Sequence, residues 1–361
     1  MKLKSIIGLL FLPALVFTVQ AAEFPLCLNG DGCGFLNADG TWRKTTAFDE
    51  VGEFSSDGLA PVRQGNKWGF INLQGQIVIT PLYDRVWEHD SNDLAMIELR
   101  WKRGFIDREG NLVIPPQFDM SYGFAPNGLA AVKKNGKWGY IDSRGEIKIP
   151  FVFQETTGFM SKDRALIYEQ NKVGAIDMKG NIVIPPKFES LWRFGVNGLA
   201  SFKQNGQYGF IDRNDRILIK PQFEDAYVFE SNNLALVKQG GLYGLINTHG
   251  KFVVKPQFEQ AHYFQSNGFA AVQKNGSWGF IDRNGQLVIS PQFDYTSGFT
   301  SNNLAQVSVG GKWGLIDTKG QFVIEPVYEK IIKLSDEFYK ALRSNTWTVY
   351  YKSQKVFVSS Q

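Results

Sequence analysis

The chain has 361 residues, and 43% of them are hydrophobic, which is ample for an extensive core. Lys and Arg number 39 against 35 Asp and Glu, and both signs are interspersed along the whole chain. A near-neutral, mixed surface lacks the basic stripe that nucleic acid or anionic lipid selects, so the composition argues against both partners.

Residues 1–22 form a segment of their own. Lys2 and Lys4 precede the apolar stretch 6–19, and small residues follow it. This order is typical of a secretory signal peptide, with cleavage after Ala21 or Ala22. A membrane anchor is the alternative, but the stretch is too short to span a bilayer, and no later stretch approaches that length. We therefore expect a periplasmic or secreted protein whose mature chain does not insert into a membrane.

The rest of the chain is an internal repeat. One glycine recurs at a constant interval of 35 residues, at Gly34, Gly69, Gly104, Gly139, Gly174, Gly209, Gly244, Gly279 and Gly314. Trp or Tyr precedes it in most copies, as at Trp68, Trp138, Tyr208, Tyr243, Trp278 and Trp313. A degenerate tenth copy follows at Trp347. This tenth copy comes one residue early, but a period that holds without slippage over nine copies is the signature of a repeat architecture.

Further positions keep the same phase. An Asp or Asn lies three residues after the glycine, as in Asp142, and a second glycine follows, as in Gly145. A proline such as Pro116 and an aromatic residue such as Phe118 come next. With Leu129-Ala-Ala-Val, Lys137-Trp-Gly-Tyr-Ile-Asp and Ile147-Lys-Ile-Pro, these positions carry a resemblance to the WG-repeat family of bacterial exported proteins. The resemblance covers nearly the whole mature chain and implies a β-repeat fold without a particular activity.

Three short apolar segments fit into one period. In the copy around Trp138 they are strand A at 129–132, strand B at 138–142 and strand C at 146–153. Asn135-Gly136 joins A to B, and the segment from Asp142 to Gly145 joins B to C. Both joints have the turn chemistry of β-hairpins. Each period is therefore predicted to be a three-stranded antiparallel meander in an all-β protein.

One meander cannot bury its own apolar face, so the units must stack on one another. We expect about ten units over residues 23–361 in an open curved or superhelical array. A closed β-propeller is the alternative, and it fits less well because propellers use four to eight blades of four strands.

The repeated residues have plain structural interpretations. The Trp ring buries a large apolar area, and the glycine after it allows a neighbouring backbone to approach closely. The proline stays out of ladder hydrogen bonding. The repeated Asp is expected to cap its own turn rather than to bind calcium, because each repeat offers only one such carboxylate.

Both cysteines, Cys27 and Cys33, lie in the first repeat. Cys33 occupies the Trp position, and Cys27 occupies a strand A position that faces it across a hairpin. We expect a disulfide that reinforces an end repeat, which has a neighbour on one side only. A reactive or metal-binding thiol pair is the alternative, and no histidine lies near it in the sequence.

Catalytic motifs are absent from the sequence. The three histidines, His89, His249 and His262, have no metal-ligand spacing, and no nucleophile elbow occurs. The repeated acidic residues are turn residues. A pair of carboxylates that cleaves a glycan is the alternative, because the sequence does not show how far apart such carboxylates lie. We expect a protein that is not an enzyme and uses no cofactor or metal.

A ligand surface is best sought where the repeat varies. The position two residues before the second aromatic of the repeat holds Trp87, Tyr122, Thr157, Trp192, Tyr227, His262 and Ser297. A fixed period aligns these residues into a stripe, and its amphipathic aromatics suit binding. The candidate ligand-binding residues are Trp87, Tyr122, Trp192, Tyr227 and His262. The alternative is that these side chains fill gaps between repeats.

The leading hypothesis is a scaffold that binds another protein in the cell envelope. A toxin-immunity or enzyme-inhibitor protein is a specific form of it. A carbohydrate- or peptidoglycan-binding module is the alternative, for which stacked Trp and Tyr rings would serve.

Overall fold

The computed structural model describes residues 23–28, 32–37, 42–45, 48–55, 57–90, 92–159, 163–334, 338–351 and 353–360. The predicted signal peptide lies outside them. Every regular element among these residues is a β-strand, and the strands form ten separate antiparallel sheets. The described residues include no helix long and apolar enough to cross a membrane. The all-β prediction and the prediction of about ten units are confirmed.

The first sheet has three strands, β1 (Glu23–Leu28), β2 (Gly32–Asn37) and β3 (Trp42–Thr45). The other nine sheets have four strands, each sheet made of four consecutive segments of the chain. Strand A of these sheets is β5 (Leu59–Gln64), β9 (Ala95–Leu99), β13 (Ala130–Lys134), β17 (Ala165–Glu169), β21 (Leu199–Gln204), β25 (Leu234–Gln239), β29 (Ala270–Lys274), β33 (Ala305–Val309) and β37 (Phe338–Arg343).

Strands B and C follow strand A as the turn residues predict. Strand B is β6 (Lys67–Asn72), β10 (Lys102–Ile106), β14 (Lys137–Ile141), β18 (Lys172–Ile176), β22 (Gln207–Asp212), β26 (Leu242–Asn247), β30 (Ser277–Ile281), β34 (Lys312–Ile316) and β38 (Thr346–Tyr351). Strand C is β7 (Ile77–Tyr83), β11 (Leu112–Phe118), β15 (Ile147–Phe153), β19 (Ile182–Phe188), β23 (Ile217–Phe223), β27 (Phe252–Phe258), β31 (Leu287–Phe293), β35 (Phe322–Tyr328) and β39 (Gln354–Ser360).

A fourth strand, absent from the predicted meander, pairs with strand A on the side away from strand B. It is short: β4 (Glu50–Val51), β8 (Arg85–His89), β12 (Met120–Ser121), β16 (Glu155–Thr156), β20 (Ser190–Leu191), β24 (Asp225–Ala226), β28 (Gln260–Ala261), β32 (Tyr295–Phe299) and β36 (Lys330–Lys333). The prediction of three strands is therefore wrong for these nine sheets. Six of these nine strands have only two residues, which are too few to produce an alternating pattern in the sequence.

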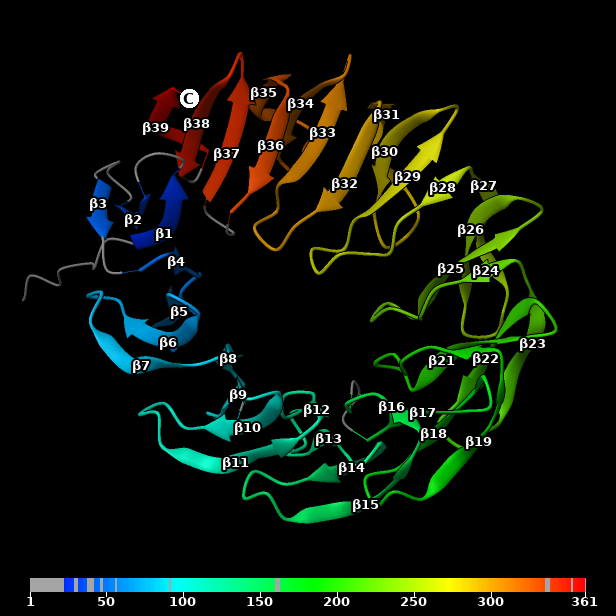
Figure 1. Cartoon of the computed structure of the whole chain (residues 1–361). Coiled ribbons are helices and arrows are strands. Elements are labelled where there is room, and N and C mark those ends of the chain that lie inside the picture. The colour runs from blue at the N-terminus through cyan, green and yellow to red at the C-terminus, as the bar shows by residue number, and fades with distance from the viewer. Residues whose placement is uncertain are drawn as a thin grey trace, which may run out of the picture.

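The sheets follow one another around a curve (Figure 1). The short strands such as β12 and β16 lie toward the centre of this curve, and the strands C such as β15 and β19 lie along its outside. No sheet among the described residues combines strands from the two ends of the chain. The predicted open array is confirmed, because the described sheets stay separate and none of them joins the two ends of the chain into a closed ring.

The apolar core lies between successive sheets rather than within any one of them. One buried cluster joins Trp138 and Ile149 of the β12–β15 sheet to Ala165 and Ile167 of the next sheet. Similar clusters fill the other joints, for example around Phe105 and Phe210. Stability therefore comes from stacking, as the repeat architecture requires.

The glycine after the repeated Trp has a steric cause. Trp138 faces Phe153, and Tyr140 faces Ile149, so strand C bulges opposite Gly139. A methyl group at Gly139 would lie 2.7 Å from the Ile149 carbonyl oxygen. Only glycine fits beneath the bulged strand, as predicted.

Candidate functional site

The candidate stripe lies at the inner edge of the sheets, directly after the short strand in five repeats and within it at Trp87 and Ser297. We call it the inner-edge stripe: Trp87, Tyr122, Thr157, Trp192, Tyr227, His262 and Ser297. Strand A holds its backbone, because the N–H of Tyr122 donates to the Ala131 carbonyl at 2.9 Å, and that of Trp192 donates to Ser201 at 2.9 Å. Two residues later a phenylalanine such as Phe124 is buried, with its ring 4.8 Å from that of Phe105 in the preceding sheet. The backbone at these stripe positions is thus held by strand A and by the buried phenylalanine that follows it.

Three of the five candidate residues are partly buried. Trp87 packs against the cluster around Phe105, and the Arg103 guanidinium lies 4.9 Å from the centre of its ring. Tyr227 packs against a cluster that includes Tyr243. The His262 ring lies 4.7 Å from that of Trp278, and burial lowers the pKa of its imidazole. These side chains fill space between strands and sheets.

The other two candidates are exposed. The Trp192 side chain is 56% exposed and makes no ring contact with another described residue. Tyr122 is 45% exposed, and one face of its ring stacks on Trp138 at 5.2 Å and 14°. The structure thus divides the stripe into gap-filling and solvent-facing members.

The search by repeat position missed two exposed tyrosines. Tyr263 directly follows His262 and is exposed. The Tyr295 ring lies 6.0 Å from Trp278 of the preceding sheet and 5.9 Å from Trp313 of its own. Because both residues lie outside the variable position, no signal in that position could have found them.

The repeated acidic residues have structural roles. Asp142 Oδ1 accepts from the N–H groups of Arg144 and Glu146, at 3.0 and 2.9 Å. Burial disfavours the charge, but hydrogen bonds from Lys148 and from these two N–H groups outweigh it and lower the pKa of Asp142 to about 2. The predicted turn cap is confirmed for the repeated Asp.

A second acidic position, after strand C, caps the turn between strands A and B. The carboxylate of Glu259 accepts from the N–H groups of Asn275 and Gly276, at 3.0 and 2.9 Å. Glu189 and Glu224 accept in the same way from Gly206 and Gly241. Among the described residues no three His, Cys, Asp or Glu side chains gather as metal ligands do.

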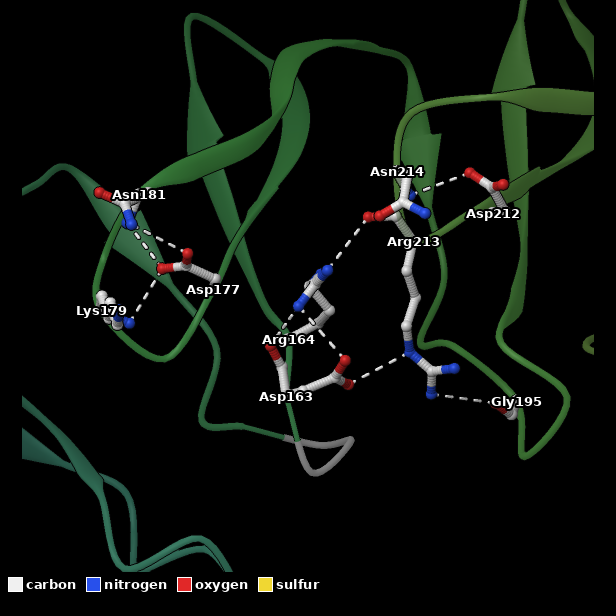
Figure 2. A network of polar contacts seen from close by, with 9 residues as sticks. All are labelled: Asp163, Arg164, Asp177, Lys179, Asn181, Gly195, Asp212, Arg213 and Asn214. Atoms are coloured by element: carbon white, nitrogen blue, oxygen red, sulfur yellow. Dashed lines mark hydrogen bonds and ion pairs between the residues drawn. The ribbon is translucent and has the colours of Figure 1, made fainter.

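Polar contacts also link neighbouring sheets. Figure 2 shows one such joint, where Arg213 Nε lies 3.2 Å from Asp163 Oδ1 and Arg164 donates to the Arg213 carbonyl oxygen at 3.2 Å. Arg213 also lies 5.7 Å from the ring of Phe194. These contacts fix the relative position of the two sheets, and both arginines are engaged in contacts within the chain.

One joint contains a buried histidine that sequence reasoning did not single out. His89 Nδ1 lies 3.0 Å from Asp57 Oδ2 of the preceding sheet, and both side chains are buried. His89 stands where most repeats have phenylalanine, and Asp57 where most have asparagine, as in Phe124 and Asn92. The paired replacement closes one joint with an imidazole and a carboxylate. His249, by contrast, lies in a turn between strands B and C.

Cys27 and Cys33 face each other in the backbone register of β1 and β2. Their side chains lie outside the described parts of the chain, so the disulfide stays a prediction.

The profile of the WG containing repeat matches nine consecutive segments, residues 34–68, 68–100, 104–138, 138–172, 174–208, 208–243, 243–278, 278–313 and 313–347. The chain belongs to the WG-repeat family. No curated protein sequence matches the WG-repeat array.

Solved structures resemble the WG-repeat array in fold alone. A eukaryotic initiation factor is 10% identical, with 83% of this chain and 94% of that chain covered and a TM-score of 0.56. The PorZ component of the type-IX secretion system of Porphyromonas gingivalis is 10% identical, with 87% and 52% covered and a TM-score of 0.29. Hsv2p of Kluyveromyces lactis is 9% identical, with 73% and 91% covered and a TM-score of 0.33. These proteins are diverse, and the likeness assigns no function.

Proposed function

We propose that the WG-repeat array is an exported, non-enzymatic scaffold that binds a protein of the cell envelope through the exposed part of its inner-edge stripe. The exposed ring of Trp192, on a backbone that strand A holds in place, is the observation that carries this proposal. Trp and Tyr dominate the binding energy of protein interfaces, and a backbone that is already held in place loses little entropy on binding.

The surroundings of Trp192 support a protein ligand. Arg193 next to it is exposed, and so is Val196 in the same loop. An aromatic ring, an aliphatic side chain and a guanidinium together match the composition of interface centres. The acidic residues that repeat are engaged in turns, which favours binding over catalysis.

Export is part of the proposal and rests on the residues 1–22. A periplasmic or secreted array without catalytic groups suits a toxin-immunity or enzyme-inhibitor protein, which acts by covering a surface of its target. A gene for an exported toxin or enzyme beside this one would favour that form.

A glycan-binding module is the second candidate, and Tyr122 favours it. Its ring stacks on Trp138 with one face and is 45% exposed, so the pair offers a flat aromatic platform. Sugars stack on such platforms through their apolar faces. Sedimentation of the protein with purified peptidoglycan distinguishes this candidate from the first.

Affinity recovery from envelope extract tests the proposal. The mature protein should recover a specific protein that the Trp192→Ala variant recovers poorly, while Trp87→Ala, at the same position in a covered setting, recovers it normally once folded. Equal recovery by all three forms would reject the stripe as the binding surface.

A further inference from the structure

One hairpin turn departs from the equivalent turns of the array. It joins β9 to β10 and consists of Arg100 and Trp101, both in the left-handed region, at φ of 52° and 65°. The equivalent pairs are Gly65-Asn66, Asn135-Gly136, Gln170-Asn171, Asn205-Gly206, Gly240-Gly241, Asn275-Gly276, Gly310-Gly311 and Ser344-Asn345. Small or polar residues take these positions because positive φ disfavours bulky side chains. A tryptophan there is unfavourable for the fold.

The Trp101 side chain does not compensate by packing. It is 82% exposed, more than any other large hydrophobic side chain that the structure describes, and it contacts no described aromatic ring or cation. A single exposed hydrophobic residue is ordinary on a protein surface. An exposed tryptophan in a disfavoured backbone conformation indicates that its side chain contacts another molecule.

The turn is firmly held. Asp84 Oδ2 accepts from the Arg100 N–H at 2.6 Å, and Asp84 Oδ1 lies 2.5 Å from Lys67 Nζ of the preceding sheet. On the other side, Lys102 forms an ion pair with Asp119. The backbone that carries the indole is therefore held in place, which reduces the backbone entropy lost on binding.

The charge around the indole is positive. Lys67 and Lys102 already neutralise Asp84 and Asp119. Arg100 is exposed and forms no ion pair among the described residues, and the same holds for Arg85 on the adjacent strand β8. The complementary surface is thus an apolar pocket bordered by carboxylates.

The Arg100-Trp101 turn suits a protein partner better than a lipid bilayer. A bilayer would meet several turns on the same side of the array, yet only this one of the nine carries a bulky apolar residue. A single projecting ring matches a single pocket.

We propose that Trp101 anchors a second binding site, separate from the inner-edge stripe, that docks into an apolar pocket bordered by carboxylates on a partner protein. Arg100 supplies the charge that orients the approach. This site does not depend on the stripe, and each can fail without the other.

The first test measures thermal stability. Asn occupies the same place in the equivalent turns, at Asn171 and Asn345, each with a φ of 61°. The Trp101→Asn variant should therefore melt at a higher temperature than the natural chain. A lower melting temperature would show that the indole supports the fold and would overturn the proposal.

The second test uses a photo-crosslinking residue, p-benzoylphenylalanine, in place of Trp101 in cells that carry the natural gene. The same residue in place of Gly136, at the next turn, is the control. Position 101 should give one protein adduct that position 136 does not give, and Arg100→Asn should reduce its yield at least tenfold. No adduct, an adduct with lipid, one of twice the mass of this chain, or one equal at both positions would each overturn the proposal. An unchanged yield with Arg100→Asn would overturn the charged border of the pocket.

Discussion

Replacing Gly139 with alanine tests the steric logic of the repeat. The new methyl group would lie 2.7 Å from the Ile149 carbonyl oxygen and 3.0 Å from the backbone nitrogen of Phe151. Ordinary contacts of this kind begin at 3.4 Å, so the shortfall is about 0.7 Å. Both atoms belong to backbone that is paired on either side, at Phe153 and Ile149, so they cannot turn away as a side chain would.

We expect Gly139→Ala to cost about 3 kcal/mol, the upper end of the range for overpacked sites, because strand β15 must separate from β14. Amide hydrogen exchange of these two strands measures the loss locally, which matters because long repeat arrays need not unfold in one step. Gly136→Asn is the matched control, since Gly136 has a φ of +78° that Asn tolerates and no atom within 4 Å of the new Cβ. A loss below about 0.5 kcal/mol for Gly139→Ala would refute the reasoning.

Three further predictions concern the core, the buried pair and the cysteines. Trp138 is 1% exposed, so Trp138→Ala should lower the local free energy of unfolding by about 3–5 kcal/mol in amide hydrogen exchange of strands β14 and β15, and a loss under 1 kcal/mol would argue against its place in the core. Burial raises the pKa of Asp57, but the Ser55 hydroxyl, the Leu59 N–H and the charges of His89 and Arg108 together lower it further. Asp57 therefore stabilises the fold above the carboxyl pKa of the unfolded chain, and its contribution is lost as the pH falls below about 4. The difference in stability between the natural chain and Asp57→Asn should shrink in that range, and a pH-independent difference would contradict the assignment. Finally, intact mass of the exported protein should fall two daltons below that of its reduced form, and labelling of both Cys27 and Cys33 by a thiol reagent would exclude the disulfide.

The repeat unit could be predicted because its signals are local and occur many times. Asn135-Gly136 and the segment from Asp142 to Gly145 fix the two turns, and the turns set the limits of strands A, B and C. The inner strand Met120–Ser121 was not predicted, because a strand of two residues produces no alternating pattern in the sequence. Strand pairing with the next segment, rather than propensity, creates it.

The candidate site was predictable in position but not in exposure. Trp87 and Trp192 occupy the same place in the repeat, yet the first lies beneath Arg103 and the second faces solvent. That difference arises from packing between side chains distant in sequence. The pairing of His89 with Asp57 was hidden for the same reason, since each residue alone is only a departure from its repeat position.

The measurement that tests the central proposal most directly is a calorimetric titration of the recovered partner with the natural chain, Trp192→Ala and Trp87→Ala, alongside their thermal melts. We predict that Trp192→Ala melts like the natural chain and binds about 30-fold more weakly, which corresponds to about 2 kcal/mol. Trp87→Ala should melt earlier and, where folded, bind normally. A Trp192→Ala variant that binds with undiminished affinity would contradict the proposed binding surface.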